Sequence, residues 1–334
     1  TIAGSLSDKY GRKPLMIIAA ITFTVSAIGT GAVNDLNWFI FYRIFGGIGI
    51  GIASNLSPMY IAEVSPSHVR GKFVSINQLT IVLGILAAQF VNWLIADPVV
   101  PGENILETWN GQMGWRWMFW AEVVPSGLFF ILIFFIPESP RWLATKLQYG
   151  KAENILSHIG GKEYAKKEIE SIKTVINVTK EKLNIRLLFQ GKIPGILLIG
   201  IVIAAFQQWC GLNVVFNYAQ EIFAAAGYGV SDILFNIVVT GVTNVIFTFV
   251  GMYTVDKLGR CSLMLFGASG LAIIYIIMGI CYYLNITGMA VLIMVVLAIA
   301  CYAMTLAPVT WVVLSEIFPN RIRGMAMACL LYTS

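Results

Sequence analysis

Charged residues are scarce in this chain of 334 residues. Asp, Glu, Lys and Arg together make up 12% of the sequence, about half the share of roughly 25% that soluble domains carry. Hydrophobic residues make up 58%, so too few charges are present to give the chain an ordinary water-exposed surface. The composition therefore indicates a membrane protein.

The sequence also lacks the patterns that hold metals and nucleotides. His68 and His158 have no metal-ligand neighbours, and the five cysteines, at 210, 261, 281, 301 and 329, show no Cys-x-x-Cys or Cys/His spacing. No Walker motif is present, and the glycine run Phe45–Gly51 follows no strand, so it predicts close helix packing rather than dinucleotide binding. We therefore expect no metal, no other cofactor, no use of ATP and no catalytic residues.

Long apolar runs are present instead. Eight of them contain about 20 residues or more, which is enough to cross a hydrocarbon core about 30 Å thick. They lie near residues 14–33, 38–61, 73–96, 115–136, 193–223, 231–254, 262–284 and 288–315. A ninth run begins after Gly324, and Thr1 lies inside what reads as the end of an earlier span. We therefore expect an internal fragment, cut at both ends.

Basic residues gather on alternate connections between these runs. They are Lys9, Arg12, Lys13, Arg70, Lys72, Lys257, Arg260, Arg321 and Arg323, together with the basic segment in the middle of the chain. The other connections hold acidic residues, with Arg116 as their one basic residue. The positive-inside rule places the basic side in the cytoplasm of a multi-pass protein. It also accounts for the net charge of +5 without nucleic acid. We expect this protein in the plasma membrane, which is the inner membrane if the cell is bacterial.

Residues 137–192 form the one long polar stretch. Ala152, Ile155, Leu156 and Ile159 follow the spacing of an amphipathic helix, and Ile169, Ile172 and Ile176 form a second, thinner stripe. Lysines alternate with glutamates on the remaining positions, which is typical of a solvated face. We predict short cytoplasmic helices that link two membrane domains.

Two motifs occur twice, about 250 residues apart. Asp8-Lys-Tyr-Gly-Arg12 recurs as Asp256-Lys-Leu-Gly-Arg260, and the motif from Glu63 to Gly71 recurs from Glu316 to Gly324. Motifs that keep their order and spacing between apolar runs indicate a duplicated unit of membrane helices. We therefore divide the chain into an N-terminal bundle, 1–136, a linker, 137–192, and a C-terminal bundle, 193–334.

Five amide side chains interrupt the apolar runs. They are Gln78, Gln207, Gln208, Asn213 and Asn244. Amides are costly in lipid unless they face a cavity or a partner, and they can both donate and accept hydrogen bonds. Hydrogen bonds between helices are the alternative. In an unbroken helix Gln208 and Asn213 point about 140° apart, but a break at Gly211 would let them converge.

Arg43 and Glu122 lie seven to eight residues inside their spans, roughly 10 to 12 Å deep. A charge at that depth needs a partner or a proton. The positions of Arg43 and Glu122 are consistent with a fixed structural ion pair and equally with a site that binds and releases a proton. Trp311 lies in mid-span after Pro308, where it could serve as a binding platform or simply pack.

The motifs resemble those of the sugar porters of the major facilitator superfamily, closest to bacterial proton-coupled xylose and glucose permeases. The matching segments are 4–13, 42–43, 63–71, 137–143, 206–213 and 308–324. The resemblance implies an all-α transmembrane fold of two pseudo-symmetric six-helix bundles. This chain would then lack span one, most of spans two and eleven, and span twelve.

The resemblance also implies roles for the polar residues. The five amides would bind the sugar, and Trp311 would stack under its ring. Arg43 and Glu122 would surround a proton-carrying aspartate on span one. Ile85, Asn217 and Ala307 depart from the pattern, where a glutamine, a tyrosine and a glycine are usual.

Charged residues of the repeated motifs can form salt bridges between helix ends that lock the cytoplasmic side. The expected pairs are Asp8 with Arg12, Glu63 with Arg70, Asp256 with Arg260 and Glu316 with Arg323, and Glu138 and Arg141 join them. We expect a monomeric importer of D-xylose or D-glucose driven by proton symport. A facilitative uniporter and a membrane sugar sensor that does not transport are the alternatives.

Overall fold

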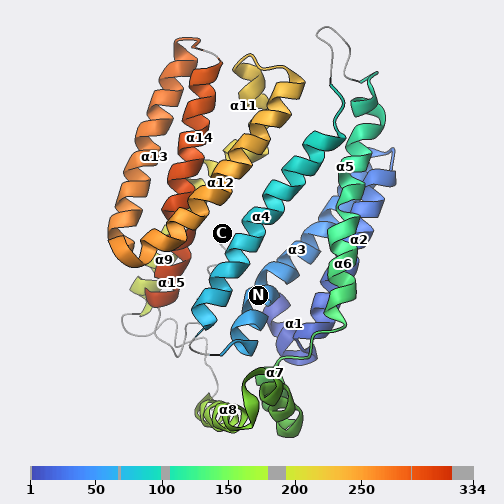
Figure 1. The fold of residues 1–334 in the computed structure, drawn as a ribbon, viewed down its shortest axis with the longest axis vertical. Helices are drawn as coiled ribbons and strands as arrows, with labels where there is room; N and C mark the ends of the chain where they lie inside the picture. Colours follow the sequence, from blue (N-terminus) through green and yellow to red (C-terminus); the bar gives the residue numbers. More distant parts are fainter. Residues whose placement is uncertain (1, 67–68, 99–105, 180–192, 287, 318–334) are drawn as a thin grey trace. The chain divides into compact units, whose positions relative to one another are not determined.

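The computed structural model describes residues 2–66, 69–98, 106–179, 193–286 and 288–317. In these ranges it is built from helices and contains no strand (Figure 1). The first half contains α1 (Ile2–Tyr10), α2 (Arg12–Ala32), α3 (Leu36–Val64), α4 (Arg70–Ile95), a π-helix (Asn110–Gly114), α5 (Trp115–Ala121) and α6 (Val123–Ile133). The middle segment forms α7 (Pro140–Thr145) and α8 (Tyr149–Thr179).

The second half begins with α9 (Ile193–Trp209), α10 (Leu212–Asn217) and α11 (Ala219–Ala225). It continues with α12 (Val230–Leu258), α13 (Arg260–Tyr283), α14 (Met289–Met304) and α15 (Leu306–Ile317). Eight helical segments in the described ranges are long and apolar enough to cross a membrane. They coincide with the eight predicted apolar runs, so the predicted all-α transmembrane fold is confirmed.

By their contacts the helices form two compact units. Unit 1 contains residues 1–77 and 115–187, and unit 2 contains residues 78–114 and 188–334. The long helix α4 therefore contributes its first residues to unit 1 and the rest to unit 2. The boundaries of the two bundles and the linker remain predictions from the sequence.

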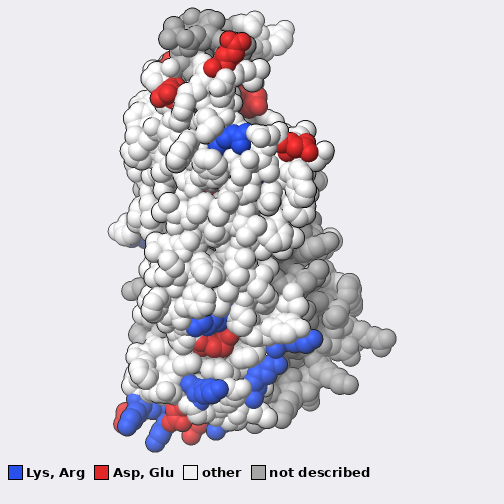
Figure 2. All heavy atoms as spheres, turned by 90° about the vertical axis from the view of Figure 1, so that its right-hand side faces the viewer, with Lys and Arg blue, Asp and Glu red and all other residues white. Residues whose placement is uncertain are grey.

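In unit 1, α2 packs against α3, α5 and α6 (Figure 1). The glycine run of α3 allows a close approach to α2, because a Cβ atom at Gly46 would overlap the hydroxyl of Ser26, and one at Gly49 would overlap Thr22. The close helix packing predicted for this run is therefore confirmed. Charged residues lie toward the two ends of the face drawn in Figure 2, and a broad uncharged band separates them.

The linker helices carry their own small core. Ala152, Leu156, Ile169 and Ile172 from the two predicted stripes are buried there with residues of α7. The α8 helix bends at Gly161, whose φ of +85° lies outside the helical range. The amphipathic helices predicted for this segment are therefore present, and the bend at Gly161 brings their two stripes into one cluster.

Three membrane segments are interrupted at polar or glycine positions. The α9 helix ends at Trp209 and α10 begins after Gly211, whose φ of +86° is left-handed. The break between α5 and α6 falls at Glu122 because Pro125 has no N–H to bond the carbonyl of Ala121. Pro308 has the same effect near the break between α14 and α15. The first two interruptions lie beside predicted site residues, and the third lies six residues before Trp311.

Candidate functional site

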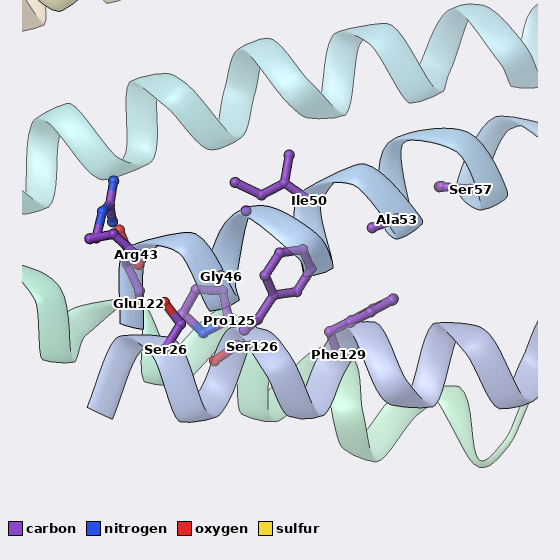
Figure 3. Close-up of a pocket in the computed structure, with 12 residues that line it drawn as sticks. Ser26, Arg43, Gly46, Ile50, Ala53, Ser57, Glu122, Pro125, Ser126 and Phe129 are labelled. Carbon is purple, nitrogen blue, oxygen red and sulfur yellow. The ribbon is translucent and has the colours of Figure 1, made fainter. Parts of the chain in front are cut away.

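A pocket of about 550 Å³ lies in unit 1 between α2, α3 and α6. Its lining is mostly small or apolar: Phe23, Ser26, Arg43, Gly46, Gly47, Ile50, Ala53, Ser57, Glu122, Pro125, Ser126 and Phe129. Arg43 and Glu122 are the two charged residues among these twelve, and Figure 3 shows their side chains next to each other. The structure thus brings the two predicted charged residues into one pocket.

The surroundings of Arg43 and Glu122 leave few other polar partners. The hydroxyl of Ser26 donates to the carbonyl of Tyr42 at 2.8 Å, and that of Ser126 donates to the carbonyl of Val123 at 3.2 Å. The guanidinium of Arg43 lies 5.3 Å from the centre of the Phe119 ring, within range of a cation–π contact. Both residues are exposed, and each is the one oppositely charged residue that the other meets among those lining the pocket.

The amides of unit 2 lie around the break between α9 and α10. The side chain of Asn213 donates from Nδ2 to Oε1 of Gln208 at 2.7 Å, which confirms that the break lets these two amides converge. Gln207 is 9% exposed, and its Nε2 donates to the hydroxyl of Tyr302 at 2.8 Å. Tyr302 was not predicted as part of the site, since nothing in the sequence pairs a tyrosine of α14 with a glutamine of α9.

The other predicted sugar-binding residues lie on different helices. Gln78 is half-buried on α4, and Asn244 is 7% exposed on α12. Trp311 lies on α15, six residues after Thr305 at the bend that follows α14, but its side chain is outside the described residues. The site residues are therefore carried by α4, α9, α10, α12 and α15, and their role in binding sugar stays a prediction.

The predicted gating residues of unit 1 form one network around Arg12. Its Nε and Nη2 atoms donate to the two carboxylate oxygens of Glu63 at 3.0 and 2.9 Å, and Nη1 donates to the carbonyl of Ser7 at 2.9 Å. Asp8 adds a second ion pair at 3.2 Å. The predicted contact of Asp8 with Arg12 is thus present, and Arg12 also binds Glu63. The predicted contact of Glu63 with Arg70 stays a prediction, because the Arg70 side chain lies outside the described residues.

Glu138 has a role that the sequence did not reveal. Its Oε1 accepts from the backbone N–H groups of Arg12 at 3.0 Å and Ser139 at 2.8 Å, and both of its oxygens accept from the N–H of Lys13 at 3.3 and 3.2 Å. The first N–H groups of a helix have no partner within it, so a carboxylate at this position satisfies them and complements the helix dipole. Glu138 therefore caps α2 from the segment that follows α6.

The remaining gating candidates are only partly described. Arg141 is exposed at the start of α7, and Arg260 begins α13. The side chains of Arg70, Asp256 and Glu316, and the whole of Arg323, lie outside the described residues. The salt bridges predicted for the second copy of the motifs therefore stay predictions.

A family model described as "Sugar (and other) transporter" matches residues 1–334. The chain belongs to this family. The D-xylose-proton symporter of Escherichia coli strain K12 is 39% identical over 345 residues, which cover 98% of this chain and 68% of that protein. The glucose transport protein of Synechocystis is 38% identical over 339 residues, covering 98% of this chain and 72% of that protein.

Solved structures of sugar transporters agree with this assignment. The xylose transporter XylE from E. coli, in a partially occluded inward open conformation, matches with a TM-score of 0.83 at 34% identity, over 99% of this chain and 75% of that one. The fold is thus that of the major facilitator superfamily, and the protein is a multi-pass membrane protein. Its relatives are sugar transporters and not enzymes.

Proposed function

We propose that this protein imports a monosaccharide, D-xylose or D-glucose, together with a proton by alternating access. The observation that carries the proposal is the pocket of unit 1, which holds Arg43 and Glu122 as its charged residues. A carboxylate inside an apolar span, next to one cation, is a group whose proton can be exchanged when its surroundings change. The name of the E. coli relative, a D-xylose-proton symporter, supports proton coupling.

The polar residues of unit 2 supply the sugar site in this proposal. Gln208 and Asn213 are joined by a hydrogen bond beside a helix break, and Gln207 is oriented by Tyr302. Gln78, Asn244 and Trp311 complete the set. Amides can both donate to and accept from the hydroxyls of a sugar, and an indole can cover the apolar face of its ring.

The Arg12 network supplies the cytoplasmic latch. It joins the end of α1, the start of α2 and the end of α3 to the segment that begins α7. Ion pairs between helix ends can form in one state and separate in another, which allows access to alternate between the two sides of the membrane. We assign these residues to gating and not to the choice of sugar.

The test of proton coupling is Glu122→Gln in the protein expressed from its complete reading frame and reconstituted in liposomes. Coupling requires that the proton affinity of the site differ between the outward-open and inward-open states. Removing the titratable carboxyl should therefore abolish most of the uphill, pH-driven accumulation, while sugar exchange at equal concentrations continues. Glu221→Gln, which changes an exposed glutamate of α11, is the matched control and should behave as the wild type.

Two other results would point to the alternatives. Wild-type uptake that never exceeds equilibrium and ignores a protonophore would replace symport by facilitated diffusion through the same site. Sugar binding without any exchange would instead favour a sensor.

A further inference from the structure

The hydrogen bond between Gln207 and Tyr302 connects two helices of unit 2. Gln207 lies near the end of α9 and Tyr302 near the end of α14, and the Nε2 atom of the amide donates to the phenol oxygen at 2.8 Å. Both atoms lie in the apolar part of the chain, where a hydrogen bond has little competition from water. This contact therefore restricts how the amide of Gln207 can turn.

The other polar atom of the Gln207 amide, Oε1, is free to accept a hydrogen bond from a ligand. Gln207 as a residue is only 9% exposed. Its Oε1 atom is buried and has no hydrogen-bond partner among the described residues. Because the amide is planar, a bond at Nε2 fixes the direction in which Oε1 points. A buried carbonyl oxygen without a donor is costly, so a ligand that brings a donor to it gains that interaction.

The backbones of both residues are held in place as well. Gln207 precedes the left-handed Gly211 by four residues, and its carbonyl accepts from the thiol of Cys210 at 2.8 Å. Tyr302 precedes the bend at Thr305, whose N–H donates to the carbonyl of Tyr302 at 3.2 Å. The Tyr302 ring also packs against two buried clusters, around Val295 and around Leu271. The phenol is thus a fixed support for the amide.

We propose that Tyr302 is a positioning residue of the sugar site, which holds Gln207 so that its Oε1 atom accepts a hydrogen bond from a sugar hydroxyl. This inference rests on the proposed function, since it assumes that Gln207 contacts the sugar. It assigns a direction to that contact, with the protein as acceptor and the sugar as donor. It also makes Tyr302 act through Gln207 and not by touching the sugar.

A double-mutant cycle tests the assignment. Affinity for D-xylose and D-glucose is measured by isothermal titration for the wild type, Gln207→Ala, Tyr302→Phe and the double variant. Each single change should weaken binding roughly 3- to 10-fold, the effect of one hydrogen bond. Adding Tyr302→Phe to Gln207→Ala should then have no further effect, because the phenol has lost the group it positions.

Tyr282→Phe is the matched control. The Tyr282 hydroxyl donates to the carbonyl of Ile222 at 3.0 Å in the same unit, outside the sugar site, so this variant should keep the wild-type affinity. An unchanged affinity in Tyr302→Phe, or a loss that adds in full to that of Gln207→Ala, would overturn the positioning role alone. Wild-type protein that binds neither sugar, or Gln207→Ala with wild-type affinity, would overturn the proposed sugar site as well.

Sugar analogues test the direction of the hydrogen bond in the wild-type protein, even if Tyr302→Phe fails to fold. The hydroxyl that meets Gln207 is the one whose deoxy analogue loses affinity in the wild type but not in Gln207→Ala. Replacing that hydroxyl by fluorine, which cannot donate, should weaken binding as much as removing it. A fluoro analogue that binds as tightly as the parent sugar would mean that Gln207 donates, and the assignment would be wrong.

Discussion

The two copies of the Gly-Arg motif have nearly the same backbone but different surroundings. Gly11 has φ 101° and ψ 170°, and Gly259 has φ 81° and ψ 152°. Each glycine is followed by an arginine that begins a long helix, Arg12 for α2 and Arg260 for α13. Such positive φ values are open to glycine and strained for other residues, so the duplicated sequence has preserved a duplicated turn.

The side chains around the two turns differ. A Cβ atom at Gly11 would lie 2.5 Å from Oε2 of Glu138, whereas nothing in the described part of the chain lies within 4 Å of one at Gly259. The capping carboxylate of the first copy comes from the segment after α6, which is far away in sequence. The comparison teaches that the repeat determines the turn, while the carboxylate that caps the helix after it comes from outside the repeat.

The largest expected effect comes from removing the anchor of the first copy. Arg12 and Glu63 have side chains only 8% and 9% exposed, so Arg12→Ala leaves a buried carboxylate without its counter-charge. This loss typically costs about 3 to 5 kcal/mol, and we expect a fall of several degrees in the melting temperature of the purified protein. Arg12→Lys should recover only part of it, because an ammonium group cannot make the paired contact to both oxygens of Glu63.

The control for this change is Asp8→Asn. Asp8 also pairs with Arg12, but its side chain is 74% exposed, so its loss should cost less than about 1 kcal/mol. Equal melting temperatures for Arg12→Ala and Asp8→Asn would show that burial of the ion pair does not stabilise this end of the protein.

A medium effect is expected from alanine at the two glycines, and this pair tests the comparison directly. Both changes place a Cβ in a strained backbone region, at a cost of about 1 to 3 kcal/mol. Gly11→Ala must also displace Glu138 from the start of α2, which adds the loss of a helix cap, about 1 kcal/mol. The melting temperature of Gly11→Ala should therefore be lower than that of Gly259→Ala. An equal or higher melting temperature for Gly11→Ala would mean that Glu138 moves aside without cost.

The spans and the polar positions within them could be predicted from the sequence because lipid imposes simple rules on both. Apolar runs of sufficient length became helices. Gly211 gave the break that joins Gln208 to Asn213, since glycine in an apolar helix next to amides marks a place where the backbone can turn. Arg43 and Glu122 line one pocket, as expected from the similar distances at which they lie inside their spans.

Contacts between distant side chains could not be predicted in the same way. The sequence predicts that Glu63 pairs with Arg70 of its own motif, and this contact stays a prediction. That Arg12 binds Glu63 from another helix was not predicted. Glu138 caps a helix that begins more than a hundred residues before it, and Tyr302 orients Gln207 across α9 and α14. Each depends on which helices are neighbours, and periodicity in one segment carries no such information.

The smallest expected effect concerns the residue after each Gly-Arg pair, which is Lys13 in the first copy and Cys261 in the second. The Lys13 ammonium donates to the carbonyl of Phe134 at 2.8 Å in an exposed position, so Lys13→Cys should cost roughly 0.5 to 1 kcal/mol. Cys261 is exposed and lies in the first turn of α13, where the helix dipole disfavours an added cation. Cys261→Lys should therefore leave the melting temperature unchanged within about a degree. A rise in melting temperature for Cys261→Lys as large as the fall for Lys13→Cys would mean that a carbonyl acceptor also lies within reach of the second turn. The two copies would then differ in sequence but not in the contact available to a lysine.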